Sequence, residues 1–246
     1  MKRSFSILIL LITIIGCSKE TAKLELPTIA TYYPLEVGKS ITYKLDSTVY
    51  LKLGTVKEVH SYVIQDRIDA IINDNAGRPS YKVKRMLRNN SDTTQWQDLT
   101  SYLVTIADKQ LEVVDKNLRF IILKEPIRND FQWKGNSFIN TISFPEFQFL
   151  DQWEYKYENV GTPLLVNGQT YPETISVIQQ VDTLGSPQNK SFYYEIIIAK
   201  EVYAKNIGLI SKEFFHETWQ PPNANSNNGY YESNSYGIKL SIIKSN

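Results

Sequence analysis

The two histidines are the first residues that could do chemistry in this chain of 246 residues, because imidazole serves as a metal ligand and as a general base. Glu213 and His216 have the three-residue spacing of a helical Glu-x-x-His metal pair. The neighbouring Phe214 and Trp219 favour a strand instead, in which Glu213 and His216 would point to opposite faces. His60 stands far away in the sequence and is expected to pack or cap at a strand edge. We therefore predict no metal site and no cofactor.

Acidic residues gather between positions 146 and 158, and a pair of carboxylates could hydrolyse a glycosidic bond. The candidates are Glu146, Asp151, Glu154 and Glu158. Glu154 and Glu158 alternate with aromatic residues, which is typical of the solvated face of a strand. The chain also has no Gly-x-Ser-x-Gly and no His-Glu-x-x-His motif. We predict no catalytic residues and a protein that is not an enzyme.

Aromatic residues in predicted loops indicate a different chemistry, the recognition of a sugar or a lipid. Trp133 stands beside the turn-forming Gly135 and is expected to be exposed. Tyr230 and Tyr231 lie in the polar stretch 221–237, which has no periodicity and predicts a long mobile loop before the last strand. These three side chains are the candidate ligand-binding aromatics. The alternative is that tryptophans and tyrosines at strand spacing fill the core.

The apolar run at the start of the chain, SILILLITIIGCSKE over residues 6–20, follows Lys2 and Arg3. It is about half as long as a membrane span and has the size of a signal-peptide core. Its end, Gly16-Cys17, resembles the lipobox of bacterial lipoproteins. The resemblance implies cleavage between Gly16 and Cys17 and acyl chains, such as palmitate, on Cys17. Cys17 is the only cysteine, so an internal disulfide is excluded.

This leader divides the chain into three predicted parts. Residues 1–16 form the signal peptide, residues 17–31 a flexible lipidated tether, and residues 32–246 one globular domain. Several acyl chains hold a protein on a membrane stably, so the membrane is the first expected partner. Ser18 is not the aspartate that retains lipoproteins at the inner membrane, which favours the outer membrane, on its periplasmic or its surface side.

The charge of the chain is nearly balanced, with 27 Lys and Arg against 26 Asp and Glu. Loss of Lys2 and Arg3 with the leader would change the formal net charge from +1 to −1. A neutral chain with interspersed signs lacks the basic footprint of a nucleic-acid-binding protein. We predict no nucleic-acid partner.

Period-two alternation of apolar and polar residues is the main structural signal. In WEYKYEN, Trp153, Tyr155 and Tyr157 share one face and charged residues share the other. Similar runs occur at 40–47 and 62–72, although Asp66 interrupts the second run and Arg85 interrupts the one after it. Asn167-Gly168 predicts a type I′ hairpin, and turn residues also fill 73–79. We predict an all-β fold with a single antiparallel, strongly curved sheet that forms a barrel, a half-barrel or a sandwich.

Five stretches carry a family resemblance: YYPLEVGKSITYKLDS, DNAGRPSYKVKRMLR, WKGNSFIN, DQWEYKYENV and YAKNIGLISKE. They are similar to an uncharacterised family of envelope lipoproteins from Bacteroidota, over about residues 32–217. Ile41 and Asn206 depart from that pattern, where an aromatic residue and a glycine are common. The resemblance implies a cell-envelope location and no particular activity.

Exported proteins of Bacteroidota are often O-glycosylated at Asp-(Ser/Thr) followed by a small or apolar residue. Three tripeptides of the chain fit this pattern, and the residues that would be modified are Ser47, Thr93 and Thr183. Short polar tripeptides also occur by chance at turns.

Three functions follow as hypotheses, in this order. The first is a non-catalytic, lipid-anchored binding or assembly component of the outer membrane, whose partner is an envelope protein or a glycan. The second is a periplasm-facing carrier that holds a hydrophobic ligand in a barrel cavity, lined by Tyr155, Phe192 or similar residues. The third is a glycan-active enzyme, which would need polar residues from several strands to meet in one pocket.

Overall fold

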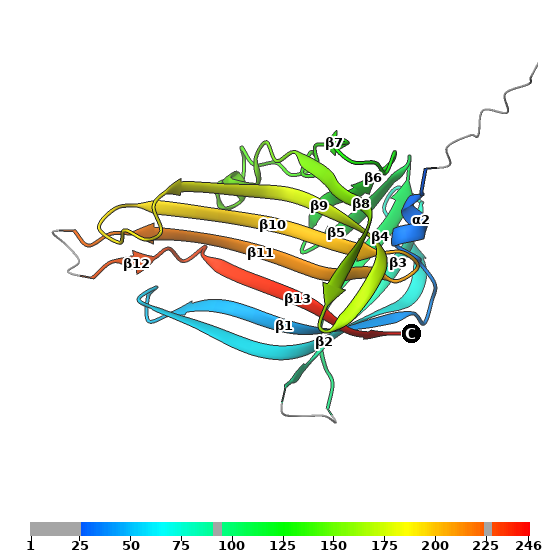
Figure 1. Ribbon diagram of the computed structural model, residues 1–246, viewed down its shortest axis with the longest axis horizontal. Helices are drawn as coiled ribbons and strands as arrows, with labels where there is room; N and C mark the ends of the chain where they lie inside the picture. Colours follow the sequence, from blue (N-terminus) through cyan, green and yellow to red (C-terminus); the bar gives the residue numbers. More distant parts are fainter. Residues whose placement is uncertain (1–25, 91–94, 224–227) are drawn as a thin grey trace, which may run out of the picture.

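The structure is a computed structural model that describes residues 26–90, 95–223 and 228–246 (Figure 1). These residues form thirteen β-strands, one short α-helix and one 3₁₀-helix. The bounds of the helices are α2 (Ile29–Tyr32) and η1 (Pro145–Leu150). The strands are β1 (Ser40–Leu51), β2 (Val56–Asn73), β3 (Pro79–Asn89), β4 (Gln97–Ala107), β5 (Gln110–Asp115), β6 (Leu118–Lys124), β7 (Gln132–Trp133), β8 (Tyr155–Val166), β9 (Gln169–Gly185), β10 (Tyr194–Ala204), β11 (Gly208–Gln220), β12 (Tyr230–Tyr231) and β13 (Tyr236–Ser245).

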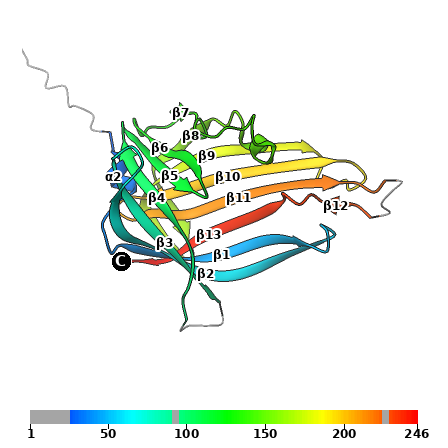
Figure 2. The ribbon, with the colours of Figure 1, turned by 180° about the vertical axis from the view of Figure 1, so that it is seen from behind.

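All strands belong to one antiparallel sheet. Its order is β6-β5-β4-β3-β2-β1-β13-β11-β10-β9-β8-β7, and β12 pairs with β11 beside this path. The sheet curls until β6 approaches β7 and β8, so that it forms a nearly closed barrel (Figures 1 and 2). This confirms the predicted all-β fold with one strongly curved antiparallel sheet.

The turn chemistry read from the sequence sets the hairpins. Asn167 and Gly168 have φ angles of 48° and 80° and join β8 to β9 through two residues, as predicted for a type I′ turn. The 73–79 turn between β2 and β3 is also confirmed, where Asp74 accepts backbone hydrogen bonds from Ala76 and Arg78 at 2.9 Å. Trp153, Tyr155 and Tyr157 are all buried, and Glu154 between them is exposed, so the predicted face is correct.

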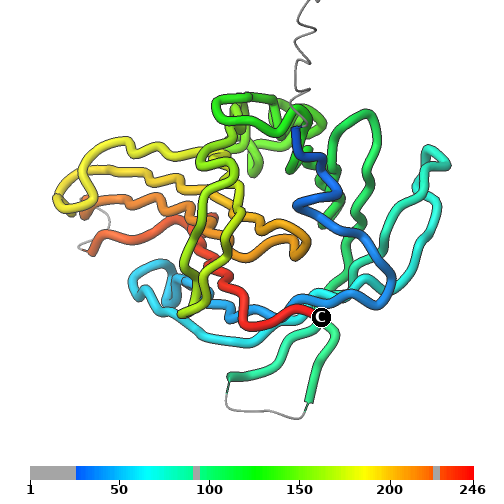
Figure 3. Tube along the Cα trace, turned by 45° about the vertical axis from the view of Figure 1, so that its right-hand side comes forward, coloured from blue at the N-terminus to red at the C-terminus, as the bar shows by residue number. Residues whose placement is uncertain are grey.

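The barrel closes between β6 and β7 with few backbone contacts. The Ile121 amide donates to the Gly135 carbonyl at 2.8 Å, and the Trp133 indole donates to the Ile121 carbonyl at 2.8 Å. In Figure 3 the green segment between β6 and β8 lies along the top of the curled trace. Contacts from this segment, including the Trp133 side chain, therefore close the barrel in place of a regular ladder of backbone hydrogen bonds between β6 and β7.

The folded domain begins before residue 32, which corrects the predicted end of the tether. Ile29 and Tyr32 in α2 are 1% and 2% exposed and pack in the main core. The Ile29 amide donates to Glu125 at 3.0 Å, and the Asn206 amide donates to the Thr31 carbonyl at 2.7 Å. The segment around α2 has few large apolar residues, so its composition did not predict that Ile29 is buried.

The predicted long loop 221–237 is also only partly a loop. It contains β12, which pairs with β11 through Trp219 and Tyr231, and its last residues begin β13. Strands β1 and β2 and strands β9 to β11 extend beyond the start of β13 as long hairpins, on the left of Figure 1. The short β12 fills part of the space between them.

Candidate functional site

A cavity of about 430 Å³ lies inside the barrel. Small-molecule sites in proteins commonly measure 300–1,000 Å³ and are mostly apolar, so the cavity has the size of a ligand site. Its walls come from β3 to β6, β8 to β11, β13 and η1. The apolar wall residues include Phe120, Ile122, Phe149, Trp153, Phe214 and Ile238.

One ion pair in the barrel joins Arg85 on β3 to Asp66 on β2. The guanidinium donates from Nε and Nη2 to the two carboxylate oxygens, both at 2.6 Å, and the Tyr102 hydroxyl donates to Oδ2 at 3.0 Å. Asp66 and Arg85 are direct cross-strand partners. A fork-to-fork pair of this kind fixes the orientation of the guanidinium.

A second ion pair joins Lys212 on β11 to Glu201 on β10. Lys212 Nζ lies 2.8 Å from Glu201 Oε1, and the Tyr203 hydroxyl donates to Oε2. These two residues are also direct cross-strand partners. In both pairs the carboxylate is buried, with Asp66 9% and Glu201 5% exposed, whereas Arg85 and Lys212 keep 23% and 34% of their side chains accessible.

Both ion pairs lie close to Tyr33, which follows α2 and lines the same cavity. Burial raises the pKa of Tyr33, and the charges of Asp66 and Glu201 raise it further. Its ring centroid is 6.1 Å from that of Tyr203. We call Tyr33, Arg85, Tyr102, Glu201, Tyr203 and Lys212 the cavity floor.

Tyr102, Tyr203 and Arg85 of the floor keep defined protonation states at neutral pH. Burial raises the pKa of Tyr102 and of Tyr203, so their hydroxyls stay protonated and can donate. Burial alone would lower the pKa of Arg85, but Asp66 raises it well above its ordinary value, so the guanidinium stays charged.

The opposite end of the cavity is covered by η1. The Phe149 ring stacks on the His216 ring, with centroids 4.4 Å apart and an interplanar angle of 15°. His216 Nε2 lies 2.9 Å from Glu195 Oε1, and the Trp153 indole donates to the Phe149 carbonyl at 2.7 Å. These contacts hold η1 over the cavity as a lid.

The opening lies beside this lid, because the exposed lining residues are found there. They are Lys116, Glu146, Asn234 and Tyr236. Strand β11 starts next to α2, lines the cavity with Leu209 and Phe214, and reaches His216 under the lid. The cavity therefore runs from the floor near α2 to an opening at the far end.

The predicted ligand-binding aromatics do not line this cavity. Trp133 is 5% exposed and packs on Tyr157 with a centroid distance of 4.6 Å, so its predicted exposure is wrong. Gly135 does mark a turn, but the turn folds inward and carries the buried Asn136 with it. Tyr230 is 36% exposed on β12, away from Trp133 on β7.

Tyr231 belongs to a separate aromatic cluster on the long hairpins. Lys190 Nζ lies 4.5 Å from the ring centroids of Tyr194 and Trp219 and 4.7 Å from that of Tyr231. Rings arranged in this way can hold a cationic ligand, but here they hold a lysine of the chain itself. The cluster is therefore filled.

The buried carboxylate of Glu217 lies beside this cluster and joins three strands. It accepts hydrogen bonds from Tyr50 on β1, from Lys57 on β2 at 2.5 Å and from Tyr194 on β10 at 2.8 Å. Strand β13 does not extend this far. The network thus ties β11 to β1 and β2 where no strand lies between them.

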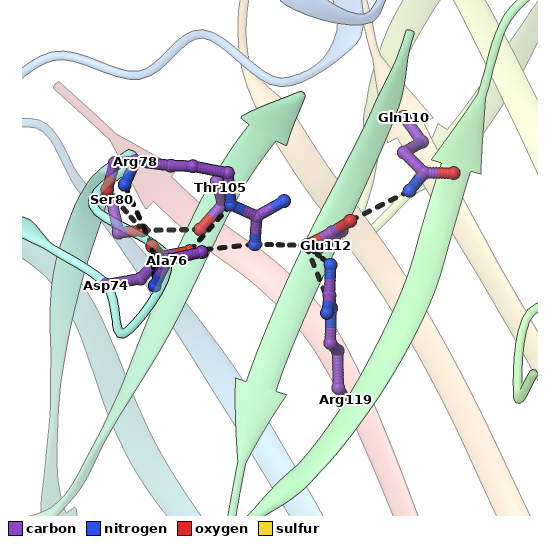
Figure 4. A network of polar contacts seen from close by, with 8 residues as sticks. All are labelled: Asp74, Ala76, Arg78, Ser80, Thr105, Gln110, Glu112 and Arg119. Atoms are coloured by element: carbon purple, nitrogen blue, oxygen red, sulfur yellow. Dashed lines mark hydrogen bonds and ion pairs between the residues drawn. The ribbon is translucent and has the colours of Figure 1, made fainter. Parts of the chain in front are cut away.

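Another polar network surrounds Glu112 on β5 (Figure 4). Its carboxylate pairs with Arg78 at 2.9 Å and with Arg119 at 2.6 Å, and Gln110 donates to it at 2.8 Å. Arg78 also pairs with Asp74 at the β2–β3 turn. None of these residues lines the cavity, so the network connects the β2–β3 turn with strands β5 and β6 rather than forming part of the site.

The predicted modification sites have different environments. Ser47 is half-buried in β1, where it lies between His60 of β2 and Ile238 of β13. Thr183 is exposed near the end of β9. Thr93, Gly16 and Cys17 lie outside the described residues.

Glu213 and His216, the candidate metal pair, do not share a face of the sheet. His216 is buried and Glu213 is exposed, as expected for a strand. In the described ranges 26–90, 95–223 and 228–246, no group of three or more His, Cys, Asp or Glu side chains is arranged to hold a metal ion. The helices within these ranges include none that is long and apolar enough to cross a membrane.

Comparisons of the chain with known protein families and curated sequences identify no relative. No protein-family model matches the chain, and no curated protein sequence matches it significantly.

Proposed function

We propose that this protein binds one hydrophobic ligand in the barrel cavity and acts as a lipid-anchored carrier at the cell envelope. The observation that carries the proposal is the cavity itself, about 430 Å³ of space inside a barrel that could have been filled by side chains. Tyr155 lines it, as expected for a carrier, whereas Phe192 is 66% exposed and does not.

The cavity supports binding better than catalysis. Polar residues from several strands do meet in it, which is the condition set for an enzyme. However, both oxygens of Asp66 and both oxygens of Glu201 already accept hydrogen bonds from neighbouring side chains. The carboxylates of these two ion pairs therefore lack the free oxygen that a general acid or base needs to reach a substrate.

Docking to an envelope protein or glycan is the second candidate function. Apolar side chains at the hairpin tips favour it: Leu53 is 96%, Phe192 66% and Leu184 60% exposed. Leu184 and Phe192 belong to the β9–β10 hairpin and Leu53 to the β1–β2 turn, and exposed apolar patches mark interaction surfaces.

Binding can be tested with the neutral fluorescent dye N-phenyl-1-naphthylamine and purified protein. Ile122→Trp fills part of the cavity and is expected to weaken dye binding at least tenfold. Leu99→Trp places the same side chain at a half-exposed position of β4 outside the cavity and is the matched control. Equal dye affinity in the two variants, or no dye binding by the wild type, would contradict the proposal.

A further inference from the structure

We propose that the ligand of the cavity is an amphiphile with an anionic head group, which lies on the cavity floor against Arg85 and Lys212 while its apolar chain extends toward η1. This inference rests on the proposed carrier function and adds the chemical class of the ligand.

The two ion pairs of the floor are oriented alike. In each pair the carboxylate is nearly inaccessible and the cation lines the cavity with accessible surface. Asp66 itself does not line the cavity. The floor therefore presents cations to a ligand, although the two ion pairs are formally neutral.

Both cations also have hydrogen-bond donors to spare. Arg85 uses Nε and Nη2 on Asp66, which leaves the N–H groups of Nη1, and Lys212 uses one of its three N–H groups on Glu201. Gln179 from β9 adds a buried amide that lines the cavity and has no hydrogen bond to another described side chain. Donors in an apolar cavity favour a head group that accepts several hydrogen bonds, as a carboxylate or a phosphate does.

A cationic head would find the carboxylates of both ion pairs already occupied. The oxygens of Asp66 and Glu201 are occupied by Arg85, Tyr102, Lys212 and Tyr203. Glu146 and Asp115 are the other acidic residues that line the cavity: Glu146 is exposed at the opening, and Asp115 Oδ1 is buried without a partner among the described residues. Asp115 is the last residue of β5, next to the exposed Lys116, and the β4–β5 register, in which Leu103 pairs with Val114, places it near Tyr102. An anion entering the cavity thus meets its neutralising charges at the inner end.

The rest of the cavity suits an apolar chain. Phe120, Ile122, Phe149, Trp153 and Phe214 line the walls between the floor and the opening. Burial of a chain against these rings favours binding through the hydrophobic effect, whereas an anion would lose its hydration there without compensation. The head and the chain of the ligand therefore have one preferred orientation.

The test is competition for the dye by four probes with the same twelve-carbon chain, each below its micellar concentration at pH 7.5. We expect dodecanoate and dodecyl phosphate to bind at least tenfold more tightly than dodecanol and dodecylamine. The ratio of the two anions distinguishes a carboxylate from a phosphate head. Equal affinity for dodecanoate and dodecanol would overturn the inference and leave the carrier function intact, whereas failure of all four probes and of the dye would contradict the carrier function.

A double substitution tests whether the cavity floor causes the preference for an anionic head group. Lys212→Met with Glu201→Gln removes both charges together, since loss of the lysine alone would leave a buried carboxylate unpaired. We expect the advantage of dodecanoate over dodecanol to fall at least fivefold. Lys205→Met with Glu173→Gln removes an ion pair of the same 2.8 Å length outside the cavity and should keep that advantage. Should the floor variant fail to fold, the comparison of probes on the wild type still decides.

Discussion

The side chain of Tyr157 binds the backbone of Lys124 as a neighbouring strand would. Its hydroxyl donates to the Lys124 carbonyl at 2.9 Å and accepts from the Lys124 amide at 2.8 Å. Lys124 ends β6, one edge of the sheet, and Tyr157 lies on β8 near the other edge. One phenol therefore satisfies both polar groups of a residue at the seam of the barrel, and burial raises its pKa so that it stays protonated.

Tyr157→Phe is expected to destabilise the protein by about 1–3 kcal/mol, because it leaves a backbone donor and a backbone acceptor at the seam without their partner. Chemical denaturation measures the loss. Tyr62→Phe is the control, since the Tyr62 hydroxyl makes no hydrogen bond with another described residue, and it should change stability by less than about 0.5 kcal/mol. A similar loss in both variants would show that Tyr157 does not close the seam.

Gly135→Ala is expected to cost more than Gly38→Ala. A Cβ at position 135 would overlap the ring of Tyr155, which is held by a 2.8 Å hydrogen bond to Asn136 and lines the cavity. A Cβ at position 38 meets open space, and only its φ of +94° opposes the change, at about 1 kcal/mol. Unfolding measurements on both variants, together with dye binding, test this contrast; normal stability and dye binding of Gly135→Ala would disprove it.

Acidification is expected to weaken the Glu217 network. Burial alone would raise the pKa of Glu217, but hydrogen bonds from Lys57, Tyr50 and Tyr194 lower it below its ordinary value. A depressed pKa in the folded state means that this stabilisation is complete above the unfolded pKa of about 4.3 and is lost as the pH falls through the folded pKa.

Glu217→Gln should therefore destabilise the protein by about 2 kcal/mol at pH 7, and the difference from the wild type should shrink as the pH falls from 5 toward 3. Unfolding free energies across this range provide the measurement. Glu213→Gln, at an exposed position of the same strand, is the control and should follow the wild type at every pH. A difference that stays constant with pH would exclude Glu217 as its source.

The lipid anchor is a proposal that one substitution addresses. Cys17→Ala removes the only sulfur that could carry acyl chains, so the variant is expected to stay uncleaved or to reach the wrong cell fraction. Metabolic labelling with a clickable fatty acid should mark the wild type and not the variant. An unlabelled wild-type protein would refute the anchor and, with it, the envelope location.

O-glycosylation, if present, is expected at Thr183 before Ser47. Thr183 is exposed, whereas Ser47 is half-buried between two strands and its neighbour Asp46 already binds Ser61 and Lys44. Intact-mass analysis of the native protein and of Thr183→Ala would show a glycan that the variant lacks. A mass equal to peptide plus lipid would remove the hypothesis.

The alternation of residues was sufficient to predict the sheet, because each strand carries its own pattern and each tight turn its own residues. For this reason the buried aromatic face predicted from WEYKYEN and the hairpin turn predicted at Asn167-Gly168 are both confirmed. The cavity was not predictable, because its floor depends on which strands pair. Asp66 and Arg85 look like two interruptions in separate apolar runs, and only the β2–β3 register makes them one ion pair.

Glu201 and Lys212 show the same difficulty on β10 and β11, where they look like ordinary surface charges in the sequence. Trp133 is the opposite case. It was predicted to be exposed because it stands beside the turn-forming Gly135, but its side chain is buried against Tyr157. A charged residue on the apolar face of each of two adjacent strands is the signal that could have found the site.

If the proposed lipid anchor and carrier function are correct, the place where the chain enters the domain determines which side exchanges the ligand. Helix α2 stands at the closed inner end of the cavity, so a protein tethered through Cys17 would turn its opening away from the bilayer that holds it. With eight residues between Cys17 and Leu26, that tether reaches at most ~30 Å. Cargo would then be exchanged with the aqueous side or with an opposing membrane, rather than drawn from the lipids beneath.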